Sequence, residues 1–321
     1  MPQITADKIL NEKRKFRLIT RSDMDGLVCA VLLKELDLID DVTFAHPKDM
    51  QDGLIDVTEN DITTNLPYNA KAFAAFDHHA SEVSRVGDTP DNHIISADTP
   101  SAARVVYDFF GGTERFPEVG EDMMDAVDKA DAAQFSKEDI LNPQGWDLLS
   151  FIMDARTGLG RFRDFNISNY QLMMQLIDHC RKHETIDCIL QLPDVKERVD
   201  LYMEHQIKAK EQIERCAKLE GSLVTLDLRQ EDTIWAANRF MIYALFPNAN
   251  ISIHVLWGKN KQNTVFAVGK SILNRTSNVN VGEMCLDHGG GGHQAAGTCQ
   301  VDNLSADEVL VTLSDHILTQ E

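Results

Sequence analysis

The sequence predicts an α/β protein with two domains, and three observations support this fold class. Up to residue 135, strand-like apolar segments alternate with helix-favouring segments, a pattern typical of a parallel sheet flanked by helices. A charged, helix-favouring segment follows at Asp194–Leu219, and strand-like segments return from Ser222. The length of 321 residues also suggests roughly two domains. We therefore expect a larger N-terminal domain, a linker helix and a smaller C-terminal α/β domain, at residues 1–190, 191–220 and 221–321.

The elements expected in the first domain follow from apolar runs and helix signals. Thr99 and Pro100 suit the N-cap and the first position of a helix. Residues 146–190 largely favour helix, and Pro193 interrupts that pattern. The predicted strands are Phe16–Thr20, Val42–Ala45 and Ala72–Phe76, and the predicted helices are Gly26–Leu36, Pro100–Phe110 and Glu121–Gln134.

The second domain is predicted to contain three strands and two helices. Alternating and β-branched residues indicate the strands. The strands are Ser222–Leu228, Ile251–Trp257 and Thr264–Ile272, and the helices are about Asp232–Leu245 and Ser305–Leu318.

Composition limits the location and the partners of the chain. The apolar stretch Gly26–Leu33 is too short to cross a bilayer, and the polar N-terminus does not resemble a secretory signal. We therefore expect a cytoplasmic protein that contacts no membrane. Six cysteines without a CxxC pair indicate reduced thiols. A net charge of -20 repels long polyanions, so a phosphate-bearing partner should be short, and long nucleic acid is not expected. A homodimer is compatible with the sequence.

Two short motifs carry metal-binding side chains at the ends of predicted strands. Asp23-Met24-Asp25-Gly26 lies between a strand and a helix, and Asp77-His78-His79 follows another strand. In open α/β sheets, ligands gather at the carboxyl ends of strands. Mixed aspartate and histidine ligands suit manganese, and less exclusively magnesium or zinc. Taken alone, the first motif also fits a helix N-cap, and the second fits a polar loop.

Two further aspartates are candidate metal ligands only when they are considered together with these motifs. Asp61 lies between the second and third predicted strands, and Asp131 ends a predicted helix. Each by itself is typical of a solvated acid.

A glycine-rich segment marks the second domain. The residues Gly289 to Gly292 precede His293, and four glycines let backbone N–H groups approach a phosphate closely. The segment Leu256–Val281 contains Lys259, Lys261, Lys270 and Arg275 and no acidic residue, which predicts a local cationic face. A flexible turn and ordinary surface lysines are the alternatives. In the first domain, Arg104 lies in the first turn of the helix after Thr99, where anions bind helix N-termini.

The order of these motifs resembles the DHH superfamily of phosphoesterases. The match covers about residues 15–135, and the glycine–histidine segment, within about residues 205–318, resembles the loop of the DHHA1 domain that commonly accompanies a DHH domain. The resemblance implies two manganese ions, with magnesium as the alternative ion. It assigns the metal ligands to Asp23, Asp25, Asp61, His78 and Asp131.

The resemblance also implies individual roles. Asp61 would bridge the two metal ions and act in catalysis with His79, which would face the substrate phosphate. Many relatives carry a histidine four residues before the first aspartate, where this chain has Ile19, so one metal site is expected to be weak. The residues expected to hold substrate are Arg104, Arg275, Gly290, Gly291, Gly292 and His293.

The function implied is hydrolysis of phosphodiester bonds in short oligonucleotides or linear dinucleotides, dependent on manganese. One alternative is a phosphoanhydride hydrolase that acts on polyphosphate or pyrophosphate. The other is a degenerate nucleotide-binding regulator, which the isoleucine at position 19 favours. The acid-rich chain favours a small phosphate substrate over a polymer.

Overall fold

The computed structural model describes residues 4–87, 90–162 and 164–321, and the chain divides into two compact units. Unit 1 comprises most of residues 4–200, and unit 2 comprises most of residues 201–321. Two short segments, 135–143 and 156–158, belong to unit 2 although unit 1 surrounds them in the sequence. The expected boundaries at residues 190 and 221 remain predictions, and helix α11 (Pro193–Cys216) lies largely between them.

Unit 1 is built on a parallel five-stranded sheet in the order β2-β1-β3-β4-β5. This confirms the predicted α/β class and the parallel sheet. The chain moves outward from β1 in both directions, so β1 and β3 flank the point where the order reverses, the usual place for a ligand in such sheets. The strands are β1 (Phe16–Thr20), β2 (Ile39–Phe44), β3 (Asp61–Thr64), β4 (Ala74–Asp77) and β5 (His93–Ile95).

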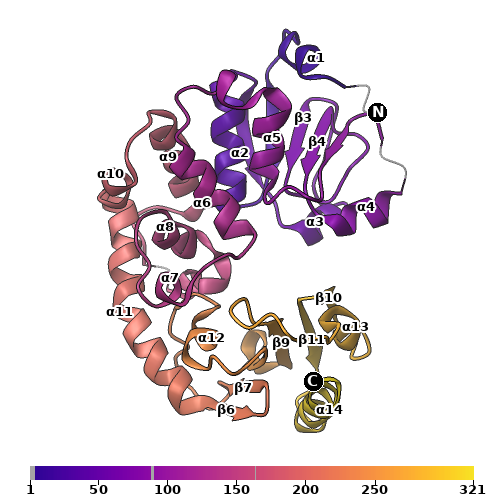
Figure 1. Ribbon diagram of the computed structural model, residues 1–321, viewed down its shortest axis with the longest axis vertical. Helices are drawn as coiled ribbons and strands as arrows, with labels where there is room; N and C mark the ends of the chain where they lie inside the picture. The colour runs from indigo at the N-terminus through magenta and orange to yellow at the C-terminus, as the bar shows by residue number, and fades with distance from the viewer. Residues whose placement is uncertain (1–3, 88–89, 163) are drawn as a thin grey trace. The chain divides into compact units, whose positions relative to one another are not determined.

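Helix α2 (Met24–Glu35) is the central helix of unit 1. Every residue from Met24 to Leu33 is buried, which is expected for a helix that is apolar on all sides. It packs against α5 (Ala102–Phe110), α6 (Glu121–Asp131) and α9 (Asn169–Arg181), and Figure 1 shows α2 and α5 together beside β3 and β4. The remaining helices of this unit are α1 (Ala6–Leu10), α3 (Pro47–Gln51), α4 (Ala80–Val86), α8 (Gly145–Met153) and α10 (Ile186–Leu190), with 3-10 turns at Gly112–Glu114 and Leu159–Arg161.

Unit 2 contains a mixed six-stranded sheet in the order β10-β11-β9-β8-β7-β6, in which only β7 and β8 pair in parallel. Its core is a cluster of apolar side chains from β8, β9 and the helices α13 and α14, among them Ile253, Phe266 and Leu313. The strands are β6 (Ala217–Glu220), β7 (Leu223–Asp227), β8 (Ile251–Trp257), β9 (Thr264–Lys270), β10 (Gly291–His293) and β11 (Ala296–Val301). The helices are α7 (Lys137–Leu141), α12 (Met241–Leu245), α13 (Val281–Leu286) and α14 (Ala306–Gln320), and 3-10 turns lie at Ala155–Thr157 and Lys259–Lys261.

The structure differs from the expected elements at several places. Strands β5, β10 and β11 were not predicted, and residues 217–219, expected in the linker helix, belong to β6. Strand β3 was not predicted, because Thr63 and Thr64 make a short, buried but polar strand. The helix expected at Asp232–Leu245 is limited to α12. The N-cap of α5 is Ser101 instead of Thr99, because the Ser101 hydroxyl accepts a hydrogen bond from the amide of Arg104. Among the described residues, no helix is both long enough and apolar enough to cross a membrane.

Candidate metal and phosphate site

Asp25 is held at the start of α2 by the amino end of another helix. Its side chain is buried, and its two carboxylate oxygens accept hydrogen bonds from the amides of Ala102 and Ala103, at 3.1 and 2.7 Å. These amides belong to the first turn of α5, whose dipole also favours a negative charge. The fold thus keeps a carboxylate in the interior beside the carboxyl edge of the sheet.

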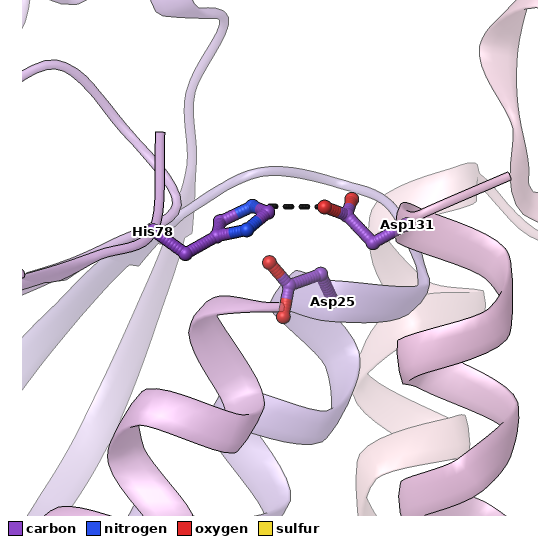
Figure 2. A group of neighbouring side chains, drawn as sticks. All are labelled: Asp25, His78 and Asp131. Atoms are coloured by element: carbon purple, nitrogen blue, oxygen red, sulfur yellow. Dashed lines mark ion pairs between the residues drawn. The ribbon is translucent and has the colours of Figure 1, made fainter. Parts of the chain in front are cut away.

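His78 and Asp131 complete a group of three side chains around one point. His78 follows β4, Asp131 ends α6, and one potential ligand atom from each of the three residues lies within 4.8 Å of the others. Figure 2 shows the three side chains converging from these separate elements. The Nε2 atom of His78 is 2.8 Å from Oδ2 of Asp131, and its Nδ1 is 3.2 Å from the carbonyl oxygen of Thr99. The Thr99 carbonyl accepts only if Nδ1 carries a proton, and this tautomer turns the lone pair of Nε2 toward Asp131.

This group fits a divalent cation. Without a proton on Nε2, the lone pairs of His78 Nε2 and Asp131 Oδ2 would face each other across 2.8 Å. The contact between these two atoms does not meet hydrogen-bond geometry. Burial, with the nearby charges of Asp131 and Asp23, raises the pKa of Asp25 well above its usual value. Burial alone would lower the pKa of His78, but its contact with Asp131 and the surrounding carboxylates raise it to about 9. The site therefore favours a positive charge between these ligands, and a cation with mixed oxygen and nitrogen preference matches them.

His79 stands beside this group and is oriented by Asp77. Its Nδ1 is 2.7 Å from Oδ1 of Asp77, which also accepts the backbone amide of His78 at 2.8 Å. Asp77 is buried, whereas the His79 side chain is about one-third exposed. A fixed Nδ1 leaves Nε2 as the ring atom available to a substrate.

Asp23 takes a different role from Asp25, although both were expected to bind metal. It is the N-cap of α2, and its Oδ1 accepts from the amide of Gly26 at 3.0 Å and from the Asn65 side chain at 3.3 Å. Its Oδ2 forms an ion pair with Nε of Arg21 at 3.1 Å. Only glycine fits at position 26, because a Cβ there would lie 1.9 Å from the carbonyl oxygen of Arg21.

The prediction that Asp61 bridges two metal ions is wrong. Asp61 begins β3 and is paired in register with Arg17, near the amino end of β1. Its carboxylate accepts two hydrogen bonds from the Arg17 guanidinium, at 2.7 and 2.8 Å, and one from the amide of Thr58. Four residues of strand, about 13 Å, separate it from Asn65 at the carboxyl edge, where Asp23 lies. Asp61 is therefore a structural acid, and its proposed part in catalysis falls with the bridging role.

Ile19 is not an empty ligand position. Its side chain is fully buried in an apolar cluster with Met50, Val57, Leu66 and Ala72. The side chain at position 19 faces the core of unit 1. The family resemblance therefore placed the missing metal ligand at a position that serves packing.

Arg104 lies close to the group but has its own partner. Its guanidinium contacts Oδ2 of Asp128 through Nε and Nη2, at 2.8 and 2.6 Å, and Ser101 donates to the other oxygen of Asp128 at 2.6 Å. Asp128 is one turn before Asp131 on α6. Arg104 thus joins α5 to α6, and its expected contact with substrate remains a prediction.

In unit 2, the glycine–histidine segment forms a β-hairpin. Gly291 to His293 pair with Ala296 to Thr298, and the turn between them lies beside the end of β9. Two of the glycines are needed for close packing. A Cβ on Gly290 would lie 2.0 Å from the oxygen of Thr298, and a Cβ on Gly292 would lie 2.3 Å from that of Ala296. The expected phosphate contacts of Gly290, Gly291, Gly292 and His293 remain predictions.

The cationic segment does not form one continuous face. Lys259 and Lys261 lie in the turn between β8 and β9, whereas Lys270 ends β9 at the opposite end of that hairpin. The amide of Lys270 donates to the carbonyl of Ala295, so Lys270 lies beside the turn that follows His293. Arg275 follows five residues later, and its Nε donates to the carbonyl of Ile272. Only Lys270 and Arg275 therefore remain candidates to act with His293.

Comparison with solved structures finds a relative of high sequence identity. A pGpG-specific phosphodiesterase, PggH, from Vibrio cholerae is 58% identical to this chain, with a TM-score of 0.85 over 96% of this chain and 100% of that one. The chain belongs to the DHH superfamily of phosphoesterases. It is therefore a hydrolase, which confirms the family and the enzyme class predicted from the motifs.

More distant structures share the fold of this family. RecJ from Thermus thermophilus, in complex with Mn²⁺, is 14% identical with a TM-score of 0.55, and the match covers 98% of this chain and 53% of RecJ. A DHH-domain protein described as a member of the s1p family of ribosomal proteins is 12% identical with a TM-score of 0.60, over 98% of this chain and 89% of that one. Comparisons with protein-family models and with curated proteins give no match.

Sequence reasoning missed several residues of this site, including Ala102 and Ala103, whose amides hold Asp25. Thr99 supplies a backbone carbonyl, which no side-chain pattern reveals. Asn65 follows a strand that was not predicted. Arg21 was visible within the strand–helix loop, two residues before Asp23, and its charge beside two aspartates was the signal that would have found it.

Proposed function

We propose that this chain hydrolyses the phosphodiester bond of short linear oligonucleotides, and that the dinucleotide pGpG is its substrate. The observation that carries the proposal is the 58% identity, over nearly the whole of both chains, to a phosphodiesterase specific for pGpG. The Asp25–His78–Asp131 group supports it, because such a group suits phosphoryl chemistry. The cytoplasmic location and the homodimer stay predictions.

We propose Asp25, His78 and Asp131 as the ligands of a divalent cation, with Mn²⁺ as the ion and Mg²⁺ as the alternative. When bound, such a cation polarises a phosphoryl oxygen and lowers the pKa of a bound water. The protein contributes the geometry, because the amides of α5 fix Asp25 and the Thr99 carbonyl fixes the tautomer of His78.

His79 is the residue that we assign to the substrate phosphate. Asp77 contacts its Nδ1 at 2.7 Å, which leaves Nε2 as the ring nitrogen available to a substrate. A positioned imidazole can donate a hydrogen bond to a phosphate oxygen or to the leaving oxygen. In unit 2, we propose Lys270, Arg275 and His293 as residues that bind a phosphate, because a guanidinium can hold a phosphate by two bonds.

The test is turnover of a substrate panel by protein that has been stripped of metal and then supplied with Mn²⁺ or Mg²⁺. The panel contains pGpG, pApA, a pentanucleotide, cyclic diguanylate, tripolyphosphate and pyrophosphate. We expect pGpG to be converted to GMP with the highest kcat/KM, and we expect no turnover without metal. Asp131→Asn, which keeps the size of the side chain, should abolish turnover and metal binding together.

Other outcomes would assign the chain differently. Faster hydrolysis of tripolyphosphate or pyrophosphate than of pGpG would identify a phosphoanhydride hydrolase. If pGpG bound without being hydrolysed under any metal condition, the chain would be a nucleotide-binding regulator. Equal rates on pGpG and pApA would support a phosphodiesterase that has no preference for guanine.

A further inference from the structure

The carboxylate of Asp23 is already occupied by donors from the protein. Oδ1 accepts from the Gly26 amide and from the Asn65 side chain, and Oδ2 pairs with the Arg21 guanidinium. The resemblance to the DHH superfamily assigned this carboxylate to a first of two metal ions. In the structure, the positive charge beside it is a guanidinium.

The other ligands that a second cation would need are absent from this place among the described residues. Asp61 binds Arg17 near the other end of the sheet, and Ile19 lies in an apolar cluster. Asn65 ends the neighbouring strand and presents an amide, whose oxygen is buried and carries no charge. A divalent ion loses hydrating water when it enters a protein site. The Asp23 carboxylate, already paired with Arg21, and the neutral amide oxygen of Asn65 would compensate that loss poorly.

We propose that this centre binds one divalent cation, at Asp25, His78 and Asp131, and that Arg21 takes the place of a second one. Arg21 is a catalytic residue in this scheme, because its guanidinium contacts a non-bridging oxygen of the scissile phosphate. Asp23 and Asn65 position it. This inference rests on the proposed function for the identity of the substrate but not for the number of ions.

The geometry around Arg21 supports this assignment. Its side chain is 28% exposed and that of Asp23 is 20% exposed, so the pair borders solvent where a phosphate can reach it. A guanidinium has five N–H donors, and the closest contact with Asp23 uses only Nε. Asp23 and the proposed metal ligand Asp25 are two residues apart in one turn, so Arg21 lies beside the same loop as one ligand of the proposed cation. Because its charge is permanent, Arg21 needs no metal to neutralise a phosphate.

Metal stoichiometry tests the proposal without any substrate. Metal-free protein is dialysed against a range of Mn²⁺ concentrations, and bound manganese is counted per chain. We expect saturation at one ion per chain and an electron paramagnetic resonance spectrum with the resolved hyperfine lines of an isolated Mn²⁺. Two ions per chain of similar affinity, with the broadened spectrum of a coupled pair about 3.5–4 Å apart, would overturn the proposal.

The role of the arginine is tested by Arg21→Ala, with Arg17→Ala as the matched control. Both variants remove an arginine from an aspartate, but the Arg17–Asp61 pair is distant from the metal group. We expect Arg21→Ala to lower kcat/KM for pGpG at least about tenfold, the loss typical of a charge-assisted hydrogen bond, while it still binds one Mn²⁺ with unchanged affinity. Arg21→Lys should recover part of the loss, and Arg17→Ala should lower thermal stability but not kcat/KM.

The outcomes separate this proposal from the proposed function. If the chain hydrolyses pGpG and binds two ions, the proposed function stands and the proposal that Arg21 replaces a second ion is wrong. Full activity in a folded Arg21→Ala variant would likewise leave the proposed function standing and contradict the catalytic role of Arg21. If the chain hydrolyses none of the panel, the count of manganese ions still decides whether the centre holds one cation.

Discussion

At the residue scale, four aspartates with the same predicted role have three different surroundings. Asp25 and Asp131 lie in the group with His78, Asp23 caps a helix, and Asp61 pairs with an arginine. What separates them is the set of partners that the fold places around each carboxylate. Spacing along the sequence could order these residues, but it could not place Asp61, because the strand that begins with it had not been recognised.

Replacement of Asp61 should therefore affect stability and leave metal binding intact. We expect Asp61→Asn to lose about 1–3 kcal/mol of unfolding free energy, because it removes a charge-assisted contact with Arg17 from a buried position. Bound Mn²⁺ per chain should equal that of the unmodified protein. Urea unfolding and metal analysis measure the two effects, and loss of manganese from a folded Asp61→Asn variant would restore this aspartate as a ligand.

The same variant should show a defined dependence on pH. Burial alone would raise the pKa of Asp61, but the hydrogen bonds from Arg17 and Thr58 outweigh it and lower the pKa below its usual value. A lowered folded pKa stabilises the protein above the unfolded pKa of about 3.9, and this contribution disappears as pH falls through the folded value. The stability difference between the unmodified protein and Asp61→Asn should thus be full near neutral pH and shrink below about pH 4. A difference that grows on acidification would contradict the Arg17 pairing.

Ile19→His should destabilise unit 1 without adding a metal ligand. The new imidazole would lie in the cluster of Met50, Val57 and Leu66, where it has no polar partner among the described residues of that cluster. We expect a loss of at least about 2 kcal/mol, measured by thermal or urea unfolding, from lost packing and a buried polar group. Ile19→Val is the control, with a loss of about 1 kcal/mol. A folded Ile19→His variant that binds manganese more tightly would show that this side chain reaches the metal group.

At the element scale, the predictable part of the fold is the part with a strong apolar signal. The strand expected at Phe16–Thr20 and that expected at Ile251–Trp257 agree with β1 and β8 residue for residue. Strand β3 gives no such signal, because it buries polar threonines. The Thr64 hydroxyl donates to the hydroxyl of Thr20 on the neighbouring strand β1 at 2.7 Å. Hydroxyl pairs of this kind depend on tertiary contacts, so a single sequence does not reveal them.

The candidate site shows the same division. The motifs singled out Asp25, His78 and Asp131 by residue type and order, and the structure brings these three side chains together. Their role as metal ligands remains a prediction. The amides of Ala102 and Ala103 and the carbonyl of Thr99 were not predictable, since every residue carries these groups. The elements that bring them to the site are fixed by packing around α2, not by local sequence.

The hairpin of β10 and β11 should distinguish two adjacent glycines. A methyl group on Gly290 would overlap the backbone of Thr298 and Cys299, whereas one on Gly291 meets no atom within 4 Å. We expect Gly290→Ala to lower the melting temperature of unit 2 by several degrees or to disrupt the hairpin, and Gly291→Ala to leave it near the unmodified value. Differential scanning calorimetry measures both. Equal effects would mean that the two strands can separate enough to admit a side chain.

At the scale of the whole molecule, the distribution of charge matters more than any single cation. The chain carries a net charge of -20, and the cationic residues near the β8–β9 hairpin are divided between its two ends. Such a surface can neutralise a few phosphates at one place, but each phosphate beyond that place meets a negative field. We therefore predict a preference for small substrates on electrostatic grounds.

We predict that kcat/KM falls as an oligoribonucleotide lengthens from two to beyond about five residues, because repulsion slows the approach of the longer polyanion. Salt screens exposed charges beyond about 10 Å at 0.1 M, so added salt should narrow the difference between lengths. Initial rates on 2-, 5-, 10- and 20-mers at low and moderate salt measure both effects. A processive exonuclease would instead gain from length, because the strand stays bound between cuts. Faster cutting of the 20-mer than of the dimer at equal concentrations of ends would show that the acidic surface does not select for length.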